Sequence, residues 1–351
     1  MTTHGRLAIG GAFLIFILIV LFGSHDTTVE PQANPFLDLA APTTTQPAAV
    51  VEAPAPEVIE EEVLTPPVDN SKALALALGR LRTSIVNIIC VSENPRLRSV
   101  SGTGTLFDSR GLILTNAHIA QLFVLKDALP KDKIECVIRT GSPARASYTA
   151  SLAYISSNWL AKHPDTLILE RPRGTGEDDI AVLAITGTVS GGTFPFSFSH
   201  VPLSDSEPFL DQEVSVGGYP AQTLTNAQIS TSLYPTLVFA SIEDRYTFTD
   251  TSFDLMSLGG SAAAQSGSSG GGVVNTDAEL IGLITTSSTQ GELFSRDLRA
   301  ITNGHIRRSF SADTGRSFDA YFASKSPQQL VADFKAQSEI LGAQLAETLD
   351  L

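Results

Sequence analysis

The sequence predicts a mainly β domain, preceded by an apolar segment and a proline-rich linker and followed by a helix. Between residues 84 and 286, short apolar runs alternate with turn residues, and examples are "SIVNIICVS", "GLILTNA", "DIAVLAI" and "ELIGLITT". Many short apolar runs at near-regular spacing are typical of a β-barrel or a β-sandwich. The two ends of the chain have other patterns, one a long uncharged run and one a helical stripe, so they lie outside this β region.

The composition excludes several classes of function. Of the 351 residues, 42% are hydrophobic, which is ample for a core, and the formal net charge is −14. A surface that binds nucleic acid or anionic lipid needs clustered Lys and Arg, so neither is an expected partner. The chain has two cysteines, Cys90 and Cys136, in neither a CxxC nor a Cys/His spacing. No metal site is therefore expected.

The N-terminal segment has the features of a membrane anchor. Residues 7–23 contain no charged side chain, and their length is at the short end of a membrane span. Arg6 precedes this run and no Lys or Arg follows it until Lys72, which predicts a cytoplasmic N-terminus. We expect a signal-anchor within residues 1–23 and a single-pass protein of the cell membrane, with its domain on the periplasmic or extracellular side. A cleaved signal peptide is the alternative, although residues 21–23 match a cleavage site poorly, and a buried core helix is a third.

The linker and the C-terminal extension flank the β domain, which is expected at residues 72–310. Residues 24–71 are rich in Pro, Ala, Thr and Glu, which predicts an extended, disordered tether. In the extension, residues 311–351, Ser326 is a candidate N-cap and Pro327 suits the first helical position. The apolar residues that follow lie on one helical stripe: Leu330, Phe334, Leu341, Leu345 and Leu349. We expect this amphipathic helix to pack on the domain or on a partner, and the second case allows a homo-oligomer.

Three short motifs in the β region contain residues suited to nucleophilic catalysis. His118 follows a predicted strand in "LILTNAH", Asp179 precedes a strand in "GEDDIAVLAI", and Ser269 stands between glycines in "GSSGG". Taken alone, these are an ordinary surface histidine, a turn residue and a linker-like run. Together they supply a hydroxyl, a base to take its proton and a carboxylate to orient that base. Asp178 has the same chemistry as Asp179, but only Asp179 adjoins the strand, so we favour Asp179.

These motifs resemble those of trypsin-like serine proteases of the chymotrypsin fold (peptidase family S1), and in detail those of the bacterial HtrA/Deg branch. The resemblance spans roughly residues 75–310 and is carried by "SGTGTLFDSRGLILTNAH", "DDIAVLAI" and "SAAAQSGSSGGGVVN" followed by "LIGLITT". It implies an all-β fold of two six-stranded antiparallel β-barrels with the active site in the cleft between them. It also implies a serine endopeptidase that acts on polypeptide substrates and needs no cofactor.

The resemblance assigns a role to each residue of these motifs. His118 would be the general base and then the general acid, Asp179 would hold its tautomer, and Ser269 would be the nucleophile. The backbone N–H groups of Gly267 and Ser269 would form the oxyanion hole, since glycine permits the left-handed backbone angles of such a loop. Thr285 would support Asp179 and begin the strand that binds the substrate backbone.

Further residues would bind the substrate or link strands. Thr286 and Ser287 would continue the substrate-binding strand. Ala263 would lie at the base of the S1 pocket, so a small or medium apolar P1 residue is expected rather than Lys or Arg. In this topology the strands of Cys90 and Cys136 are neighbours, and the two thiols either form a disulfide or stay free in the core.

Three features depart from the family pattern. Ser268 stands where trypsin-type enzymes have Asp and HtrA relatives have Asn, so activation by insertion of a new N-terminus is not expected. Residues 311–351 are too few for the PDZ domain that is usual in the HtrA branch. The insertion at residues 157–176 would form either part of the cleft rim or an exposed loop. Two non-catalytic alternatives remain, a catalytically silent protease-fold binding module at the cell surface and a β-barrel display domain on a stalk.

Overall fold

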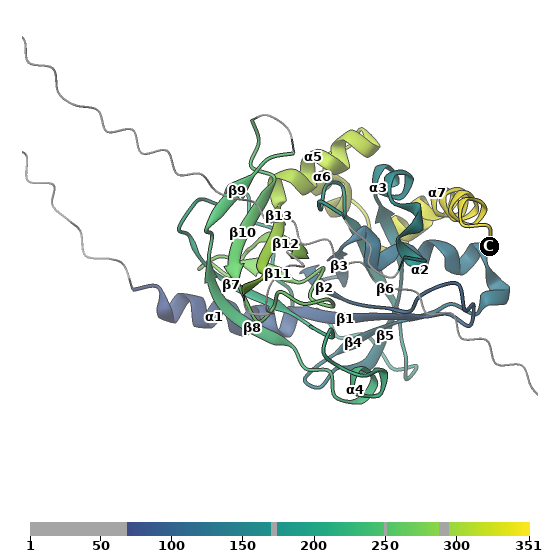
Figure 1. The fold of residues 1–351 in the computed structure, drawn as a ribbon, viewed down its shortest axis with the longest axis horizontal. Coiled ribbons are helices and arrows are strands. Elements are labelled where there is room, and N and C mark those ends of the chain that lie inside the picture. Colours follow the sequence, from purple (N-terminus) through teal and green to yellow (C-terminus); the bar gives the residue numbers. More distant parts are fainter. Residues whose placement is uncertain (1–68, 170–173, 249–250, 288–294) are drawn as a thin grey trace, which may run out of the picture. The chain divides into compact units, whose positions relative to one another are not determined.

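The structure covers the predicted β domain and the C-terminal extension. A computed structural model describes residues 69–169, 174–248, 251–287 and 295–351 (Figure 1). The predicted membrane anchor and most of the linker, within residues 1–68, lie outside these ranges. Among the helices of the described residues, none combines the length and the apolar character needed to cross a membrane.

The first sheet closes into a six-stranded antiparallel barrel, as predicted. Its strands pair in the order β1-β2-β3-β6-β5-β4. Their bounds are β1 (Ile85–Val91), β2 (Val100–Asp108), β3 (Leu112–Thr115), β4 (Glu135–Thr140), β5 (Arg145–Ile155) and β6 (Ala181–Thr188). Ile88, Ile113 and Leu183 are fully buried, because side chains fill the interior of a small barrel.

The second sheet differs from the prediction, because it has seven strands and stays open. Its strands pair in the order β8-β7-β11-β12-β13-β10-β9. Their bounds are β7 (Glu213–Gly218), β8 (Thr236–Ser241), β9 (Asp244–Tyr246), β10 (Leu255–Gly260), β11 (Gly272–Val274), β12 (Leu280–Ser287) and β13 (Asp297–Thr302). The edge strand β9 is short, and no side chain of the other edge strand, β8, is fully buried. Only Ile242, which is buried, and Glu243 separate β8 from β9, so the two ends of this strand order are consecutive in the chain. Among the described residues the second sheet is thus a seven-stranded half-barrel, where a closed six-stranded barrel was predicted.

The helices cover the sheets and connect their strands. Their bounds are α1 (Ser71–Ser84), α2 (Ala117–Ala128), η1 (Pro130–Asp132), α3 (Ser157–Lys162), η2 (Pro164–Leu167), α4 (Asn226–Thr231), α5 (Asn303–Thr314), α6 (Phe318–Ala323) and α7 (Pro327–Thr348). Helix α1 leads directly into β1 and packs against β7, β8 and β11, so it bridges the first barrel and the second sheet. Helix α5 packs on α6, β12 and β13.

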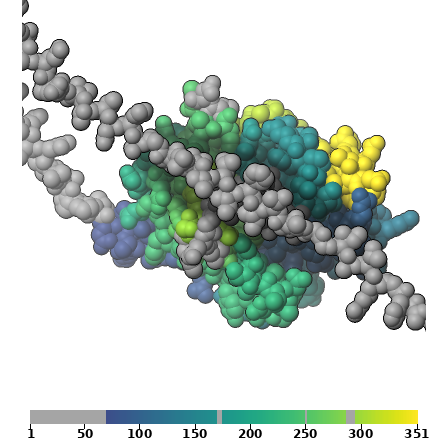
Figure 2. All heavy atoms as spheres, in the orientation of Figure 1, coloured from purple at the N-terminus to yellow at the C-terminus, as the bar shows by residue number. Residues whose placement is uncertain are grey.

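The C-terminal helix α7 packs on the first barrel. Ser326 and Gln329 form a capping box around Pro327, which confirms the predicted start of this helix. Four residues of the predicted stripe are buried: Leu330, Phe334, Leu345 and Leu349. They face α2, β5 and β6, and Figure 2 shows the yellow atoms of this end of the chain beside teal and blue atoms of earlier segments. Because this stripe is covered within the chain, an oligomer would have to use another face of α7. The homo-oligomer stays a prediction.

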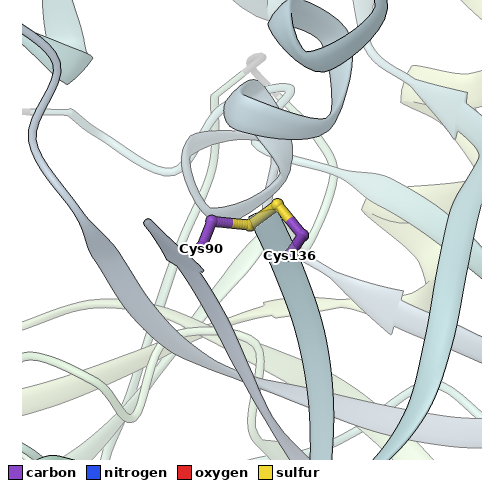
Figure 3. The surroundings of a disulfide bond; sticks show 2 residues. All are labelled: Cys90 and Cys136. Carbon is purple, nitrogen blue, oxygen red and sulfur yellow. A yellow bond between two sulfur atoms is a disulfide. The ribbon is translucent and has the colours of Figure 1, made fainter. Parts of the chain in front are cut away.

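A disulfide joins two neighbouring strands of the first barrel. β1 and β4 pair antiparallel, with Cys90 opposite Cys136. Figure 3 shows the two side chains bridging these strands, and their sulfur atoms are bonded. The structure therefore has the bridge, rather than the two free thiols that were the alternative.

Candidate active site

Strands β3 and β6 bring His118 and Asp179 together. His118 lies in the first turn of α2, shortly after the end of β3, and Asp179 lies shortly before the start of β6. The two strands pair with Thr115 opposite Ala181, so the segments that adjoin these residues are neighbours. Nδ1 of His118 lies 2.7 Å from Oδ2 of Asp179. The backbone N–H of His118 also donates to Oδ1 of the same carboxylate, at 3.0 Å.

Asp179 is buried and held by several hydrogen bonds. The residue is 4% exposed, and the hydroxyl of Thr285 on β12 donates to its Oδ2 at 3.1 Å. The side-chain amide of Asn116 donates to its backbone carbonyl at 2.9 Å. Asn116 was assigned no role from the sequence, although it lies inside the "TNAH" motif. A carboxylate fixed in this way orients the imidazole and leaves Nε2 available to accept a proton.

The neighbouring carboxylate of Asp178 points to other partners. Asp178 has a left-handed backbone, with φ of 57°. Its carboxylate accepts a hydrogen bond from the hydroxyl of Ser309 at 2.6 Å and lies 3.1 Å from Nζ of Lys162. The turn therefore sends its two acidic side chains in different directions, and only that of Asp179 reaches His118.

The loop that carries Ser269 passes so close to other backbone segments that two of its positions require glycine. Gly267 has φ of 102°, and a Cβ there would lie 2.6 Å from the carbonyl oxygen of Tyr219. Gly270 has φ of 85°, and a Cβ there would lie 1.9 Å from the carbonyl oxygen of Thr103. Any larger residue would strain the loop and push it away from both sheets. The glycine run is thus part of the packed interior.

Two backbone N–H groups of this loop find no acceptor in the part of the chain that the structure describes. Among the described residues, the N–H groups of Gly267 and Ser269 form no hydrogen bond. The carbonyls that share their peptide groups, those of Ser266 and Ser268, accept hydrogen bonds at 2.8 and 2.9 Å. Because C=O and N–H point in opposite directions in a trans peptide, both free N–H groups point away from these partners. Two free donors separated by a single peptide group, here Gly267–Ser268, can together bind an anionic oxygen.

The hydroxyl of Ser269 is bonded to a backbone carbonyl and, in the hydrogen bonds of the described residues, not to His118. It donates to the backbone carbonyl of Thr285 at 3.3 Å, and the hydrogen bonds of the described residues include none between Ser269 and His118. The next serine, Ser268, is 1% exposed, and its hydroxyl has no partner among the described residues. Ser268, which stands where trypsin-type enzymes have Asp, is therefore enclosed in the loop.

The insertion at residues 157–176 contributes to the surroundings of His118. Its helix α3 packs against α2, and the ring of Trp159, which is buried, lies with its centroid 6.4 Å from that of His118. The ring of His163 is also near Trp159, with the two centroids 5.1 Å apart. Trp159 is the one tryptophan of the chain, but its place beside His118 had no signal in the local sequence pattern.

The residues predicted to bind substrate are only partly described. Ala263 is fully buried in the core of the second sheet. The backbones of Thr286 and Ser287 pair with Arg299 and Leu298 of β13. The chain that follows β12, residues 288–294, lies outside the described ranges, so the S1 pocket and its preference for small apolar residues stay predictions.

Comparison with known proteins identifies the family. The trypsin-like peptidase domain family matches residues 102–283, which is just over half of the chain. No curated protein matches the sequence. Among solved structures, the active form of the Rv3671c protease from M. tuberculosis matches at 17% identity with a TM-score of 0.43, over 80% of this chain and 96% of that one. An inactive serine-to-alanine mutant of the same protease from M. tuberculosis H37Rv matches at 15% identity with a TM-score of 0.41, over 68% and 90%. The chain belongs, on the family match, to the trypsin-like serine peptidases.

Proposed function

We propose that the protein is a membrane-tethered serine endopeptidase, with His118, Asp179 and Ser269 as its catalytic triad. The observation that carries this proposal is the pair of free N–H groups at Gly267 and Ser269. They have no partner among the described residues, and one of them is the N–H of Ser269 itself, in a loop where Gly267 and Gly270 both have a left-handed backbone. The buried Asp179–His118 pair supplies the base that such a serine needs.

The reaction would begin with a rotation of the Ser269 side chain from the carbonyl of Thr285 toward Nε2 of His118. His118 then takes the hydroxyl proton while Oγ attacks the scissile carbonyl carbon. The resulting oxyanion accepts hydrogen bonds from the two free N–H groups, each worth about 10²–10³ in rate in related enzymes. The intermediate collapses as His118 returns the proton to the leaving amine. In the second half of the reaction His118 takes a proton from water, the water attacks the acyl carbon, and His118 returns the proton to Oγ of Ser269 as the acid product leaves.

The substrate is proposed to be an extended polypeptide. Its backbone would pair with the end of β12, Thr285–Ser287, and its P1 side chain would be small or medium and apolar. Support comes from Ala263, which brings no charge to the expected base of the pocket. A peptide library profiled for cleavage would test this, and a preference for Lys or Arg at P1 would contradict it.

The tether and the location of the domain are proposed from the sequence. Residues 1–23 would anchor the chain with its N-terminus in the cytoplasm, residues 24–71 would act as the spacer, and the domain would be periplasmic or extracellular. Protease added to cells with an intact cytoplasmic membrane and an opened outer envelope should digest the domain, whereas protection that is lost only when the cytoplasmic membrane is lysed would contradict this orientation. N-terminal sequencing of the cellular protein separates an intact anchor from a cleaved signal peptide.

A catalytically silent binding module is the second candidate, because the Ser269 hydroxyl is bonded to Thr285 and not to His118. In the module a bound peptide would leave the hydroxyl where it is. In the enzyme a small rotation activates it, and apo forms of serine enzymes often have loose nucleophile–base geometry.

Labelling with a fluorophosphonate separates the two candidates. The full-length chain in detergent should form a covalent adduct at Ser269, located by mass spectrometry, and should hydrolyse a fluorogenic peptide. Ser269→Ala and His118→Ala should abolish both, while Ser190→Ala, in an exposed loop, should retain both. Absence of labelling in the wild type would rule out the enzyme.

A further inference from the structure

Thr103 of the first barrel contacts the loop around Ser269 through two atoms. It lies on β2, within the "SGTGT" run, and is fully buried. Its hydroxyl donates to the carbonyl of Gly267 at 2.6 Å and accepts the backbone N–H of Tyr219 at 2.8 Å. Its own backbone N–H donates to the carbonyl of Ser269 at 2.8 Å. One residue therefore binds carbonyls on both sides of Ser268.

The peptide groups of this loop alternate between free and bonded donors. The groups that contribute the N–H of Gly267 and of Ser269 leave these donors free. The groups that follow each of them, Gly267–Ser268 and Ser269–Gly270, are bonded at both ends. Their N–H groups donate to backbone carbonyls of the protein at 3.1 and 2.8 Å, and their carbonyls accept hydrogen bonds from Thr103.

We propose that Thr103 is a positioning residue that sets the direction of the two oxyanion-binding N–H groups. A planar peptide can turn only about its flanking Cα atoms, so a fixed neighbour on one side limits the rotation of each donor group. Gly267 depends most on this restraint, because it has no Cβ to hinder rotation at its φ of 102°. The inference rests on the proposed function, since the direction of these donors matters only where an oxyanion binds.

The substitution Thr103→Val removes the hydroxyl while keeping nearly the same shape. The carbonyl of Gly267 and the N–H of Tyr219 then lose their partner inside the protein, and the loop is expected to turn to find others. We expect kcat to fall about 10- to 100-fold with KM changed by less than about threefold. The reason is that the turned N–H groups bind the oxyanion less well, and the oxyanion forms only on the way through the transition state. Thr103→Ser, which keeps the hydroxyl, should restore kcat to within about threefold of the wild type.

Thr105 offers a matched control on the same strand. Its hydroxyl is also buried and donates to the carbonyl of Gly270 at 3.1 Å. That carbonyl belongs to the Gly270–Gly271 peptide group, which carries neither free donor and reaches the Ser268–Ser269 peptide group only through its N–H, at 2.9 Å from the carbonyl of Ser268. Thr105→Val should therefore lower kcat less than Thr103→Val does. A general loosening of the loop would instead lower kcat equally in both valine variants.

A peptide boronic acid ending in boro-alanine measures the donors directly. It adds to the serine as a tetrahedral boronate, so its Ki in the full-length Thr103→Val protein should rise by the same factor as kcat/KM falls. If that variant does not fold, judged by circular dichroism, the Thr103→Ser and Thr103→Ala pair isolates the hydroxyl in the same way. An unchanged Ki, an equal loss in Thr105→Val, or no recovery in Thr103→Ser would overturn the inference and leave the proposed function intact. A wild type that neither cleaves peptide nor reacts with fluorophosphonate would overturn both.

Discussion

The imidazole of His118 and the carboxylate of Asp179 meet at 2.7 Å across 61 residues of sequence. The backbone N–H of His118 donates to the same carboxylate, so the pair is locked by two bonds rather than one. The contact at Nδ1 favours the proton on that nitrogen and leaves Nε2 available as a base, while the backbone hydrogen bond holds His118 against the carboxylate.

Replacing Asp179 should therefore affect catalysis far more than replacing its neighbour. In Asp179→Asn the amide can no longer select the productive tautomer, and kcat for a peptide substrate should fall about 10³- to 10⁴-fold, as in related triads. Asp178→Asn, whose side chain contacts Lys162 and Ser309, should lose less than about tenfold. Comparable losses in both variants would show that the carboxylates act through the turn and not through His118.

Gly267→Ala should disable the loop, because Cβ would meet the backbone carbonyl of Tyr219 at 2.6 Å with φ held at 102°. We expect a loss of about 3 kcal/mol in the free energy of unfolding from strain and clash. Activity should also fall at least about 100-fold as the N–H turns away.

Gly315→Ala is the matched control for positive φ. Gly315 ends α5 with φ of 69°, and a Cβ there meets nothing within 4 Å. It should cost about 1 kcal/mol and leave kcat unchanged. Urea unfolding and initial rates measure both effects, and equal stability losses at the two glycines would refute the clash at Gly267.

The disulfide should stabilise the first barrel without taking part in catalysis. Cys90 and Cys136 are 46 residues apart, and in the chain-entropy account a bridge closing a loop of that length contributes about 4 kcal/mol. Guanidinium unfolding of Cys90→Ala/Cys136→Ala should show a loss of this order, with kcat nearly unchanged below the unfolding transition. Non-reducing peptide mapping that found both thiols free would contradict the bridge.

A second histidine–carboxylate pair predicts a pH dependence of stability. His305 on α5 is buried, with Nδ1 3.2 Å from Oδ1 of Asp254, and its Nε2 accepts the backbone N–H of Asp178 at 3.4 Å. Burial lowers the pKa of His305 below its usual 6.5, although the charge of Asp254 opposes this. The pKa of Asp254 is itself lowered, since hydrogen bonds from Ser252 and Arg308 outweigh its burial.

Stability changes with pH wherever the unfolded and the folded chain bind different numbers of protons. Below pH 6.5 the unfolded chain protonates His305 before the folded chain does, so stability is full above pH 6.5 and falls as the pH drops toward the lower folded pKa. His305→Gln, which does not titrate, should make this slope shallower. Urea unfolding midpoints measured between pH 5 and pH 7 check this, and an unchanged slope in the variant would contradict it.

Local sequence determined those features whose cause is local. Ser326 and Pro327 mark the start of α7 because capping and the fixed φ of proline act within one turn. The glycines around Ser269 identify their loop because only glycine accepts its backbone angles. The strand runs of the first barrel were readable because their apolar residues recur within each strand.

Tertiary structure alone decided what depends on long-range pairing. The sequence favoured Asp179 over Asp178, but the register of β3 against β6 is what brings its carboxylate to His118, and packing of the insertion places Trp159 beside His118. The strand order of the second sheet, which begins at β8 and ends at β9, also depends on such pairing. The hydroxyl of Thr103 reaches the carbonyl of Gly267 across 164 residues. Contacts of this kind depend on the geometry between strands distant in the chain, which no local pattern of residue types encodes.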